Sequence, residues 1–479
     1  MAGLWDFLRS KFPDLHLLDT VKKVADDLGV EVYLVGGYVR DLFLDRPCKD
    51  IDFMVVGDGV AAATQVYKQL GLQGRPVVYK NFGTASFSYK DLWIEFVGAR
   101  KESYSRHSRN PHVEPGTLDD DLARRDFTVN SMAILLTGPD AGELVDKFGG
   151  LQHLMEKILV TPLEPVKTFD DDPLRMLRGI RFAVQLDFRI HPQVLESMKI
   201  CRERLHIVAP ERIGEELNKM LQSPRPAMAF KLMFNTGILE VIFPEMARLH
   251  GVEYQDGHGH KDNFFHTLDV LTRLRARTDN VWLLWSAVLH DIAKPRTKRY
   301  EPGHGWTFHG HEEVGARMVP GIFKKLGLPQ NEKCQYVQKL VRLHLRPIVL
   351  TKDNITDSAI RRLIYEAGDD LEDLLMLCEA DITSKNENKV RRYLNNYQLV
   401  RKKIEEVEAR DRIRNFQPPV RGEEVMKMFN LAPCKTVGIL KAAVKEAILD
   451  GIIPNEREAA LQYLIKEARK LGLEPVSDP

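Results

Sequence analysis

The sequence predicts an α+β fold in its first third and an all-helical fold beyond it. Between residues 30 and 140, short β-rich runs alternate with helical stretches. The four clearest runs are 32–35, 51–56, 85–89 and 92–97. After residue 150, long amphipathic stretches broken by proline and glycine replace them. At 479 residues the chain is too long for one hydrophobic core, so several domains are expected.

The bulk composition describes an ordinary globular protein. The chain carries 69 Lys and Arg against 68 Asp and Glu, so any nucleic-acid site must be a local basic patch. Its five cysteines form no CxxC pair, which favours reduced thiols over a disulfide framework or a zinc ribbon. No run approaches the ~20 apolar residues of a membrane span, and no signal-peptide pattern opens the sequence. We therefore expect no membrane partner and a cytoplasmic location.

The most informative stretch is LVGGYVRDLFLDRPCKDIDFMVV. An apolar run ends at Gly36 and Gly37, and a helix then begins with Arg40 in its first turn. A glycine pair allows close backbone approach and presents amide donors at a helix N-terminus, which suits phosphate. Asp50 and Asp52 follow on a strand, so their carboxylates share one face about 7 Å apart, as shared divalent cations require. The combination indicates metal-dependent chemistry on a nucleoside triphosphate.

Each half of this pattern also has an ordinary explanation. A Gly-Gly turn is common, and a DxD pair alone usually marks a solvated strand edge or a turn. In this order, GGxVRD followed by a strand DxD resembles the head of the polymerase-β-like nucleotidyltransferases. The specific resemblance is to the class II tRNA nucleotidyltransferases, which are the CCA-adding enzymes and the related bacterial poly(A) polymerases. It implies that Asp50 and Asp52 hold two Mg²⁺ ions.

Two further motifs fit this resemblance. Glu95, in the run WIEFVGAR, stands where the family places its third acid, with Arg100 after it. Judged alone, Glu95 could equally be an exposed strand residue. In DLARRDFTVNSMA, Arg125 would bind phosphate and Asp126 a ribose hydroxyl, although charged residues are also ordinary at a helix start. Asn130 would cap or brace this motif.

A polar series marks the stretch DDDPLRMLRGIRFA. Asp172, Arg175, Arg178 and Arg181 recur every three residues, which on one continuous helix gives a slowly spiralling stripe with apolar residues packed behind it. A solvated arginine face is the ordinary interpretation of such a helix. The stretch nevertheless resembles the EDxxR motif with which the family selects nucleotides, with Asp171 in place of Glu.

The resemblance gives Asp172 and Arg175 a role that their chemistry supports. A carboxylate accepts a hydrogen bond from the amino group of cytosine or adenine and repels the carbonyl oxygen that uracil and guanine carry there. Arg175 can donate to the neighbouring ring nitrogen. A charge left unpaired against the wrong base costs several kcal/mol, which is enough for strong discrimination. Arg178 and Arg181 would then face the triphosphate or brace Asp172.

Two later segments extend the resemblance nearly to the end of the chain. The stretch APERIGEELNKML, residues 209–221, is expected to hold helices together and not to touch substrate. Residues 390–421 are basic and would either follow an RNA backbone or form a solvated helix with local ion pairs. The cationic candidates in this segment are the RKK run at Arg401, then Arg410, Arg412 and Arg414.

Histidines are concentrated between residues 250 and 344. A lone helical histidine is usually structural, but an adjacent His-Asp pair with a distant His and Asp resembles the ligand set of HD metal-dependent phosphohydrolases. The candidate ligands are His266, His290, Asp291, His311, His344 and Asp381. Imidazole with carboxylate suits Mn²⁺, Co²⁺ or Ni²⁺. His311 and His344 would add a second metal, with His309 as the alternative to His311.

The resemblance implies a division of the chain into four parts. They are a nucleotidyltransferase head (1–145), a helical neck and body (146–250), an HD domain (251–390) and a helical tail that binds tRNA (391–479). The expected activity is template-independent addition of C, C and A to the 3′ end of tRNA from CTP and ATP. One alternative is a poly(A) polymerase or an enzyme adding only CC or only A. The other is an HD phosphohydrolase with an RNA-binding head, which the intact head carboxylates disfavour.

Overall fold

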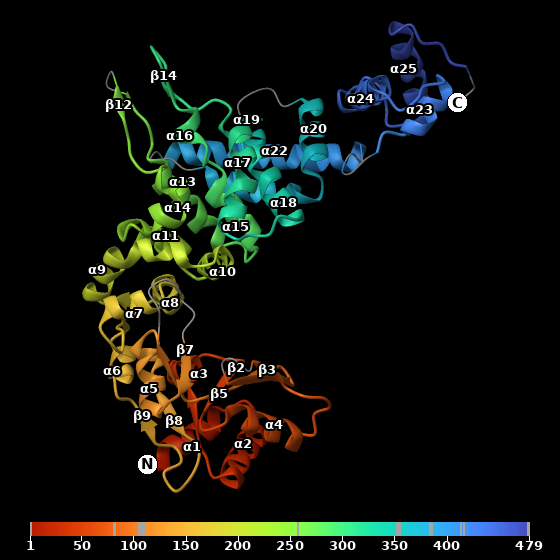
Figure 1. Cartoon of the computed structure of the whole chain (residues 1–479). Coiled ribbons are helices and arrows are strands. Elements are labelled where there is room, and N and C mark those ends of the chain that lie inside the picture. The colour runs from red at the N-terminus through yellow and green to blue at the C-terminus, as the bar shows by residue number, and fades with distance from the viewer. Residues whose placement is uncertain are drawn as a thin grey trace. The chain divides into compact units, whose positions relative to one another are not determined.

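The structure is a computed structural model that divides into two compact units, Met1–Ala247 and Arg248–Pro479 (Figure 1). It describes residues 2–79, 83–103, 112–255, 258–350, 356–382, 387–411, 414 and 417–476. The first unit holds the large sheet, and the second is built from helices and two short hairpins. The predicted change from an α+β fold to a helical one is therefore confirmed, while the finer division into four parts stays a prediction.

A seven-stranded sheet forms the centre of the first unit, in the order β3-β4-β5-β2-β1-β8-β9. Its strands are β1 (Glu31–Val35), β2 (Asp50–Val56), β3 (Val77–Tyr79), β4 (Thr84–Tyr89), β5 (Leu92–Gly98), β8 (Ala133–Leu135) and β9 (Leu144–Val145). Strands β2 and β5 run parallel, and the other neighbours are antiparallel. The four predicted strands are confirmed. Strands β3, β8 and β9 were not predicted, because runs of two or three residues carry almost no periodicity.

One face of the sheet is covered by helix α4 (Gly59–Gln69), which begins where the Asp58 side chain accepts hydrogen bonds from two backbone amides. Phe53 on β2 stacks against Phe96 on β5, with ring centroids 4.9 Å apart. Phe96 meets Phe87 on β4, and Phe87 in turn meets Tyr67 of α4 edge to face. This aromatic layer fixes β2 and β5 side by side.

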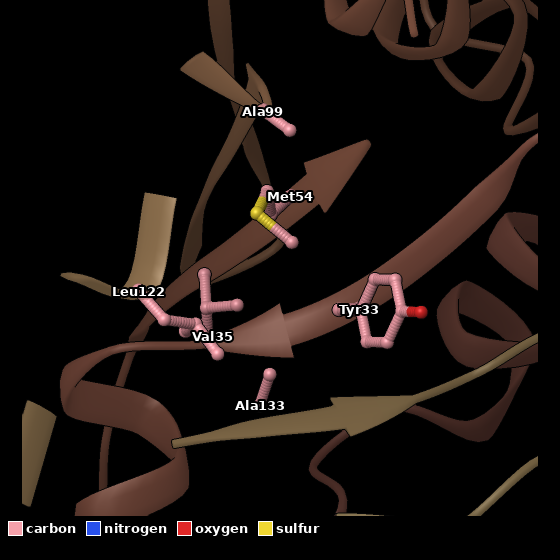
Figure 2. Packing of buried hydrophobic residues seen from close by; sticks show 6 residues of the cluster. All are labelled: Tyr33, Val35, Met54, Ala99, Leu122 and Ala133. Carbon is pink, nitrogen blue, oxygen red and sulfur yellow. The ribbon is translucent and has the colours of Figure 1, made fainter. Parts of the chain in front are cut away.

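The opposite face carries a smaller apolar cluster and, beyond it, the candidate catalytic carboxylates. Figure 2 shows the cluster, in which Met54 of β2 lies near Val35 and Tyr33 of β1. Because side chains alternate along a strand, Met54 shares its face with Asp50 and Asp52. The apolar packing therefore holds the strand rigid up to the point where its polar residues begin.

Helices and short strand pairs surround this sheet. The further elements of the first unit are α1 (Ala2–Lys11), α2 (Leu15–Leu28), α3 (Gly37–Phe43), β6 (Arg100–Ser103), β7 (His112–Pro115), α5 (Leu118–Ala123), α6 (Gly150–Met155), β10 (Ile158–Leu159), α7 (Pro165–Asp171), α8 (Leu174–Leu186), β11 (Arg189–Ile190), α9 (Pro192–Cys201), α10 (Pro210–Leu221), α11 (Pro226–Asn235), α12 (Ile238–Ile242) and α13 (Pro244–Ala247). The core of the helical part is helix α8, which packs against α10 and α11. Its Leu174, Leu177 and Ile180 are buried as predicted.

The predicted continuous stripe helix is wrong at its start. Helix α7 ends at Asp171 and α8 begins at Leu174, so only the three arginines share one helix. Asp172 between them has an extended backbone, with φ −135° and ψ 99°. The cause is Pro173, because a proline disfavours helical geometry in the residue before it. Asp172 is therefore presented from a bend, where its side chain accepts from the backbone N–H of Leu174 at 3.2 Å.

The second unit consists mainly of helices. Its elements are β12 (Tyr254–Gln255), β13 (His258–Gly259), α14 (Asn263–Arg275), α15 (Val281–Leu289), α16 (Lys294–Thr297), β14 (Arg299–Glu301), β15 (Gly305–Thr307), α17 (His311–Lys325), α18 (Glu332–Leu343), α19 (Arg346–Val349), α20 (Asp357–Ala367), α21 (Leu371–Asp381), α22 (Glu387–Asp411), α23 (Gly422–Met428), α24 (Lys435–Leu449) and α25 (Arg457–Lys470).

Helix α15 is the centre of the histidine-rich part of this unit. Its sequence, VWLLWSAVL, is apolar all round, as expected of a helix buried on every side. It packs against α14, α18 and α21. Trp285 is fully buried beside Phe323 of α17. None of the helices in the described part of the chain combines the length and the apolar character that a membrane crossing needs.

Candidate active site and metal centre

Three candidate carboxylates gather at one end of strands β2 and β5. In the parallel register Asp52 is the direct partner of Glu95, and Asp50 lies one step back on the same face. All three line a cavity of about 810 Å³. The same cavity is lined by the other head residues predicted from sequence, namely Gly36, Gly37, Arg40, Arg125, Asp126, Asp172, Arg175, Arg178 and Arg181.

The two facing carboxylates are held close to each other against their mutual repulsion. Burial raises the pKa of Asp52, as does the charge of Asp50, while Arg125 opposes both. Burial and the charge of Asp52 raise the pKa of Glu95, against the effect of Arg100. Oxygen ligands with an excess of negative charge are the donor set of hard divalent cations. The residues present therefore fit such ions.

Gly36 is required by this site for two reasons. Its φ of 72° lies in the region that favours glycine. A Cβ added there would also lie 2.9 Å from Arg125 Nη1 and 3.2 Å from Asp52 Oδ2. The missing side chain thus lets the Arg125 guanidinium approach the Asp52 carboxylate.

A carboxylate that the sequence analysis overlooked holds the arginines of the RRDFT stretch. Asp121 is fully buried, and its two oxygens bind Arg124 at 2.5 Å and Arg125 at 2.9 Å. Arg124 also donates to Glu102 at 3.0 Å. The (i, i+3) and (i, i+4) spacing of Asp121 from these arginines was the only signal in the sequence.

A second network joins helix α3 to helix α8. Arg40 donates to the Asn130 side chain at 2.8 Å, and Asn130 donates to Asp126 at 2.9 Å. Asp126 also accepts from Arg178 at 2.7 Å. Burial alone would raise the pKa of Asp126, but Arg178 and Asn130 outweigh it and hold that pKa well below its ordinary value. Asn130 therefore braces the motif, and Asp126 fixes one arginine of the stripe.

The last arginine of the stripe has a partner outside the head motifs. Arg181 donates to Glu216 of α10 at 2.6 Å, and both side chains are buried. Its carboxylate partner is thus Glu216 in place of Asp172. Arg212 of the same helix lines the cavity, so the 209–221 segment borders the candidate site, and the expectation that it does not touch substrate stays a prediction. Buried Leu217 does hold the helices together, as expected.

The six HD candidates come together in the second unit as two triads. His266, His290 and Asp381 form one, and Asp291, His311 and His344 form the other, with ligand atoms within 4.8 Å inside each triad. They come from α14, the end of α15, α17, the end of α18 and α21. His309 is 84% exposed and lies by Glu301, so His311 is the member of the cluster.

The protonation of three imidazoles follows from their hydrogen bonds. The Nδ1 atoms of His290, His311 and His344 lie 2.7, 2.8 and 2.7 Å from backbone carbonyl oxygens. A carbonyl only accepts, so each Nδ1 carries a proton, and each Nε2 has a lone pair for the cluster whenever the imidazole is neutral. Within the described part of the chain these buried Nε2 atoms make no hydrogen bond, although those of His290 and His311 lie 3.3 and 3.2 Å from the Asp291 carboxylate. Lone pairs directed this way are the arrangement of metal-ligating histidines.

Without a metal the cluster balances its charge with a proton. Burial would lower the pKa of His290, but the carboxylates of Asp291 and Asp381, 3.3 and 3.6 Å away, raise it to about 10. Burial and the His290 charge lower the pKa of His344 to about 3. The centre thus attracts positive charge, and a divalent cation would displace that proton.

Two lysines next to the cluster were not identified from the sequence. Lys294 donates to Asp291 at 2.6 Å, and Lys261 Nζ lies 2.8 Å from His266 Nδ1. Lys294 follows Asp291 by three residues on one helical turn, a spacing that could have revealed it. Lys261 precedes α14 and carried no such signal.

The basic tail segment is largely paired with acids. Arg401 bonds to Glu372 and Arg410 to Asp357, both at 2.6 Å and both on neighbouring helices. Arg414 pairs with Glu408. Arg412 lies outside the described residues. The pairs of Arg401 and Arg410 therefore connect helices, whereas Arg414 pairs locally with Glu408, at a spacing other than the (i, i+4) that the sequence suggested.

Three segments match known families. Residues 32–160 match the poly A polymerase head domain, 187–249 the probable RNA and SrmB-binding site of polymerase A, and 263–385 the HD domain. The fold and the two sites thus define a polymerase-β-like nucleotidyltransferase joined to an HD domain. Domains of both kinds use divalent metal ions. The arginine stripe falls between the first two matched segments.

Curated relatives give the family. The multifunctional CCA protein of Nitrosococcus oceani is 34% identical over 376 residues, 74% of this chain and 86% of that protein. The A-adding tRNA nucleotidyltransferase of Deinococcus radiodurans is 33% identical over 367 residues, 74% and 81% of the two chains. The chain belongs to the class II tRNA nucleotidyltransferase and poly(A) polymerase family, as predicted.

Solved structures agree in fold. The Thermotoga maritima CCA-adding enzyme complexed with tRNA gives a TM-score of 0.59 at 21% identity, covering 96% of this chain and 98% of that one. A tRNA nucleotidyltransferase complexed with a primer tRNA and an incoming ATP analog gives 0.56 at 23% identity, covering 80% and 99%. At these identities the likeness concerns the fold alone.

Proposed function

We propose that this protein adds C, C and A to the 3′ end of tRNA, using CTP and ATP and no nucleic-acid template. The observation that carries the proposal is one cavity lined both by the carboxylates Asp50, Asp52 and Glu95 and by the base-reading candidates Asp172 and Arg175. The curated relatives named above support it, since one is called a multifunctional CCA protein.

In the reaction the 3′ oxygen of the RNA attacks the α-phosphorus of the nucleotide, and the bond to the leaving pyrophosphate breaks. Mg²⁺ held by Asp50, Asp52 and Glu95 would supply charge neutralisation for the attacking and leaving oxygens. The side chains of the protein would hold the substrates in position. Arg178, held by Asp126, would contact the triphosphate.

Base choice would rest on Asp172 and Arg175. The bend before Pro173 presents the Asp172 carboxylate at the cavity wall, close in sequence to the Arg175 guanidinium. Cytosine and adenine offer an amino donor next to a ring-nitrogen acceptor, which this pair complements. Uracil and guanine offer a carbonyl oxygen, which leaves the carboxylate unsatisfied.

The test is addition to a tRNA that lacks its CCA end, with Mg²⁺ and each nucleotide alone or mixed, resolved on a sequencing gel. CTP alone should add two nucleotides, and the CTP and ATP mixture should add three. A long ladder with ATP alone would instead identify a poly(A) polymerase. Products that stop after CC, or that need a preformed CC end, would identify a partial enzyme.

We propose a second, metal-dependent phosphohydrolase activity for the histidine cluster. It is supported by six candidate ligands in two triads and by three buried Nε2 atoms that make no hydrogen bond to the residues the structure describes. The donor set favours Mn²⁺, Co²⁺ or Ni²⁺ over Mg²⁺. Elemental analysis of the purified protein and hydrolysis assays on phosphomonoesters and cyclic phosphodiesters test it. Absence of both metal and hydrolysis with every divalent ion would refute it.

A further inference from the structure

An exposed apolar strip lies on the same sheet that carries the head carboxylates. On β3, Val77 and Tyr79 are 52% and 49% exposed, and on β5 Trp93 is 41% exposed. Val77 and Tyr79 lie on the edge strand β3, and exposed apolar side chains beside a catalytic centre can mark a binding surface. The three residues, called the apolar strip below, are separated by strand β4, because Trp93 lies beside Ser88 while Val77 and Tyr79 lie beside Ser86 and Thr84.

The strand register places this strip on the catalytic face of the sheet. Trp93 is the direct partner of Asp50, and it precedes Glu95 by two residues, so all three side chains point the same way. Tyr79 of β3 is the register partner of Thr84 on β4, and Thr84 lies two residues along β4 from the partner of Glu95. Tyr79 therefore points to the same face of the sheet as Glu95. Trp93 thus stands about 7 Å along its strand from Glu95.

The strip and the arginines lie on different sides of strand β2. In the sheet order, β5, β4 and β3 follow β2 on one side, and β1 follows it on the other. Helix α3 continues from β1, and its Arg40 lies 5.2 Å from the Phe182 ring of α8, over which Arg178 and Arg181 also lie. The guanidinium groups of Arg40, Arg178 and Arg181 therefore gather on the β1 side, whereas the β3–β5 side carries the apolar strip and Arg100, which follows β5 and also lines the cavity.

This division assigns the two substrates to two sides. The triphosphate, which carries the larger charge, fits the arginine side. The attacking hydroxyl must reach the same carboxylates from elsewhere, and the β3–β5 side is open to it. Tyr79 lines the cavity itself, so this end of the strip adjoins the reaction centre. Exposed aromatic rings beside a nucleic-acid path commonly stack bases, because every base offers a π face.

We propose that Trp93 and Tyr79 together form a stacking platform of two separate rings, one on each side of Glu95 along the strands, for the terminal bases of the RNA acceptor. This inference rests on the proposed nucleotidyl transfer to RNA. The platform would hold the end of the strand while its 3′ hydroxyl lies at Asp50, Asp52 and Glu95, whichever base ends the chain. It would position the acceptor by shape and would not read its sequence.

The first experiment compares single variants for RNA binding and for addition. Trp93→Ala and Tyr79→Ala should each raise the KM for RNA about tenfold, within the range for loss of one stacked base. The KM for ATP should stay at its wild-type value. Trp93→Phe should restore most of the loss. Val78→Ser is the matched control, because Val78 is 38% exposed on the opposite face of the same strand.

The second experiment removes a base of the RNA acceptor and leaves the Trp93 ring in place. With an acceptor whose terminal nucleotide is abasic, wild-type protein should bind as weakly as Trp93→Ala, and the variant should lose nothing further. An equal additional loss in the variant would overturn the platform. Unchanged RNA affinity of the variant together with an altered oligomeric state would also overturn the platform, because the strip would then be a protein contact. RNA affinity is read by fluorescence anisotropy, so a wild type that binds RNA but adds nothing refutes the proposed function and leaves this test intact.

Discussion

The head cavity and the histidine cluster both gather carboxylates, but they balance that charge in opposite ways. In the head, burial raises the pKa values of Asp52 and Glu95, and the neighbouring carboxylates raise them further against the effect of Arg125 and Arg100. In the cluster, Asp291 and Asp381 have pKa values well below the ordinary one, because imidazoles outweigh their burial. The head thus leaves negative charge uncompensated, and the cluster compensates it internally.

This difference indicates how each site would treat a metal. The head offers oxygen ligands in an open cavity of about 810 Å³, where an ion would arrive together with the substrate phosphates. The cluster offers nitrogen ligands whose orientation is fixed by backbone carbonyls. It would retain an ion before any substrate binds. The two sites should therefore differ in metal preference, and each can be disabled without the other.

The largest effect is expected from Asp52→Ala. Loss of a carboxylate that would hold the head Mg²⁺ ions should lower nucleotide addition by about a thousandfold or more, since charge neutralisation is worth several kcal/mol. RNA binding and any hydrolysis at the cluster should persist. Asp91→Ala, which removes an exposed carboxylate next to β5, is the control. Addition near the wild-type rate would refute the metal assignment.

The converse substitution is His290→Ala with Asp291→Ala. Removing one ligand from each triad should abolish bound transition metal and phosphohydrolase activity. Nucleotide addition should stay at the wild-type rate. His309→Ala provides a matched control, because this exposed histidine lies outside the cluster. A double variant that folds by circular dichroism yet stops adding nucleotides would show that the two sites are coupled.

An intermediate effect is expected on base choice. Asp172→Ala should lower incorporation of C and A by roughly tenfold to a hundredfold relative to G and U, because only the preferred bases lose a hydrogen bond. Single-nucleotide incorporation assays with all four triphosphates measure it. A fall that is equal for the four nucleotides would mean that Asp172 acts structurally, through the bend between α7 and α8.

The features predicted best from the sequence are those whose residues lie close together in the chain. The glycine pair, the DxD strand and the arginine stripe each lie within one motif, so spacing alone brought their residues together. The six cluster residues span 115 positions and were grouped only through the resemblance to HD proteins. The sequence could not decide between His309 and His311, because it does not show the contact with the Phe308 carbonyl that orients His311.

The acidic partners of two arginines were not predicted. Glu216 reaches Arg181 across 35 positions, and Glu102 reaches Arg124 across 22. No periodicity connects such pairs, since they depend on how helices and strands pack. The break at Pro173 is a different error. Its local signal was present, but the regular three-residue spacing of the arginines obscured it.

The opposite charge balance also predicts opposite effects on stability in metal-free protein. Asp381→Asn should lower the free energy of unfolding at neutral pH by about 3 kcal/mol, because His266 and His290 lose a buried partner. The pKa of Asp381 is depressed, so its contribution is present above the unfolded-state pKa. That contribution fades as the pH falls through the folded-state value, and the variant should then approach the wild type.

Glu95→Gln should change the free energy of unfolding in the opposite direction and by a smaller amount. Burial and the Asp52 charge raise the pKa of Glu95, so its ionised form destabilises the fold at every pH above the folded-state pKa. The substitution should therefore stabilise metal-free protein by on the order of 1 kcal/mol, as active-site replacements often do. The gain should shrink as the pH falls through the folded-state pKa and vanish below the unfolded-state one. Urea denaturation with a chelator, at neutral and acid pH, measures both variants. Destabilisation by Glu95→Gln would contradict the charge balance inferred for the head.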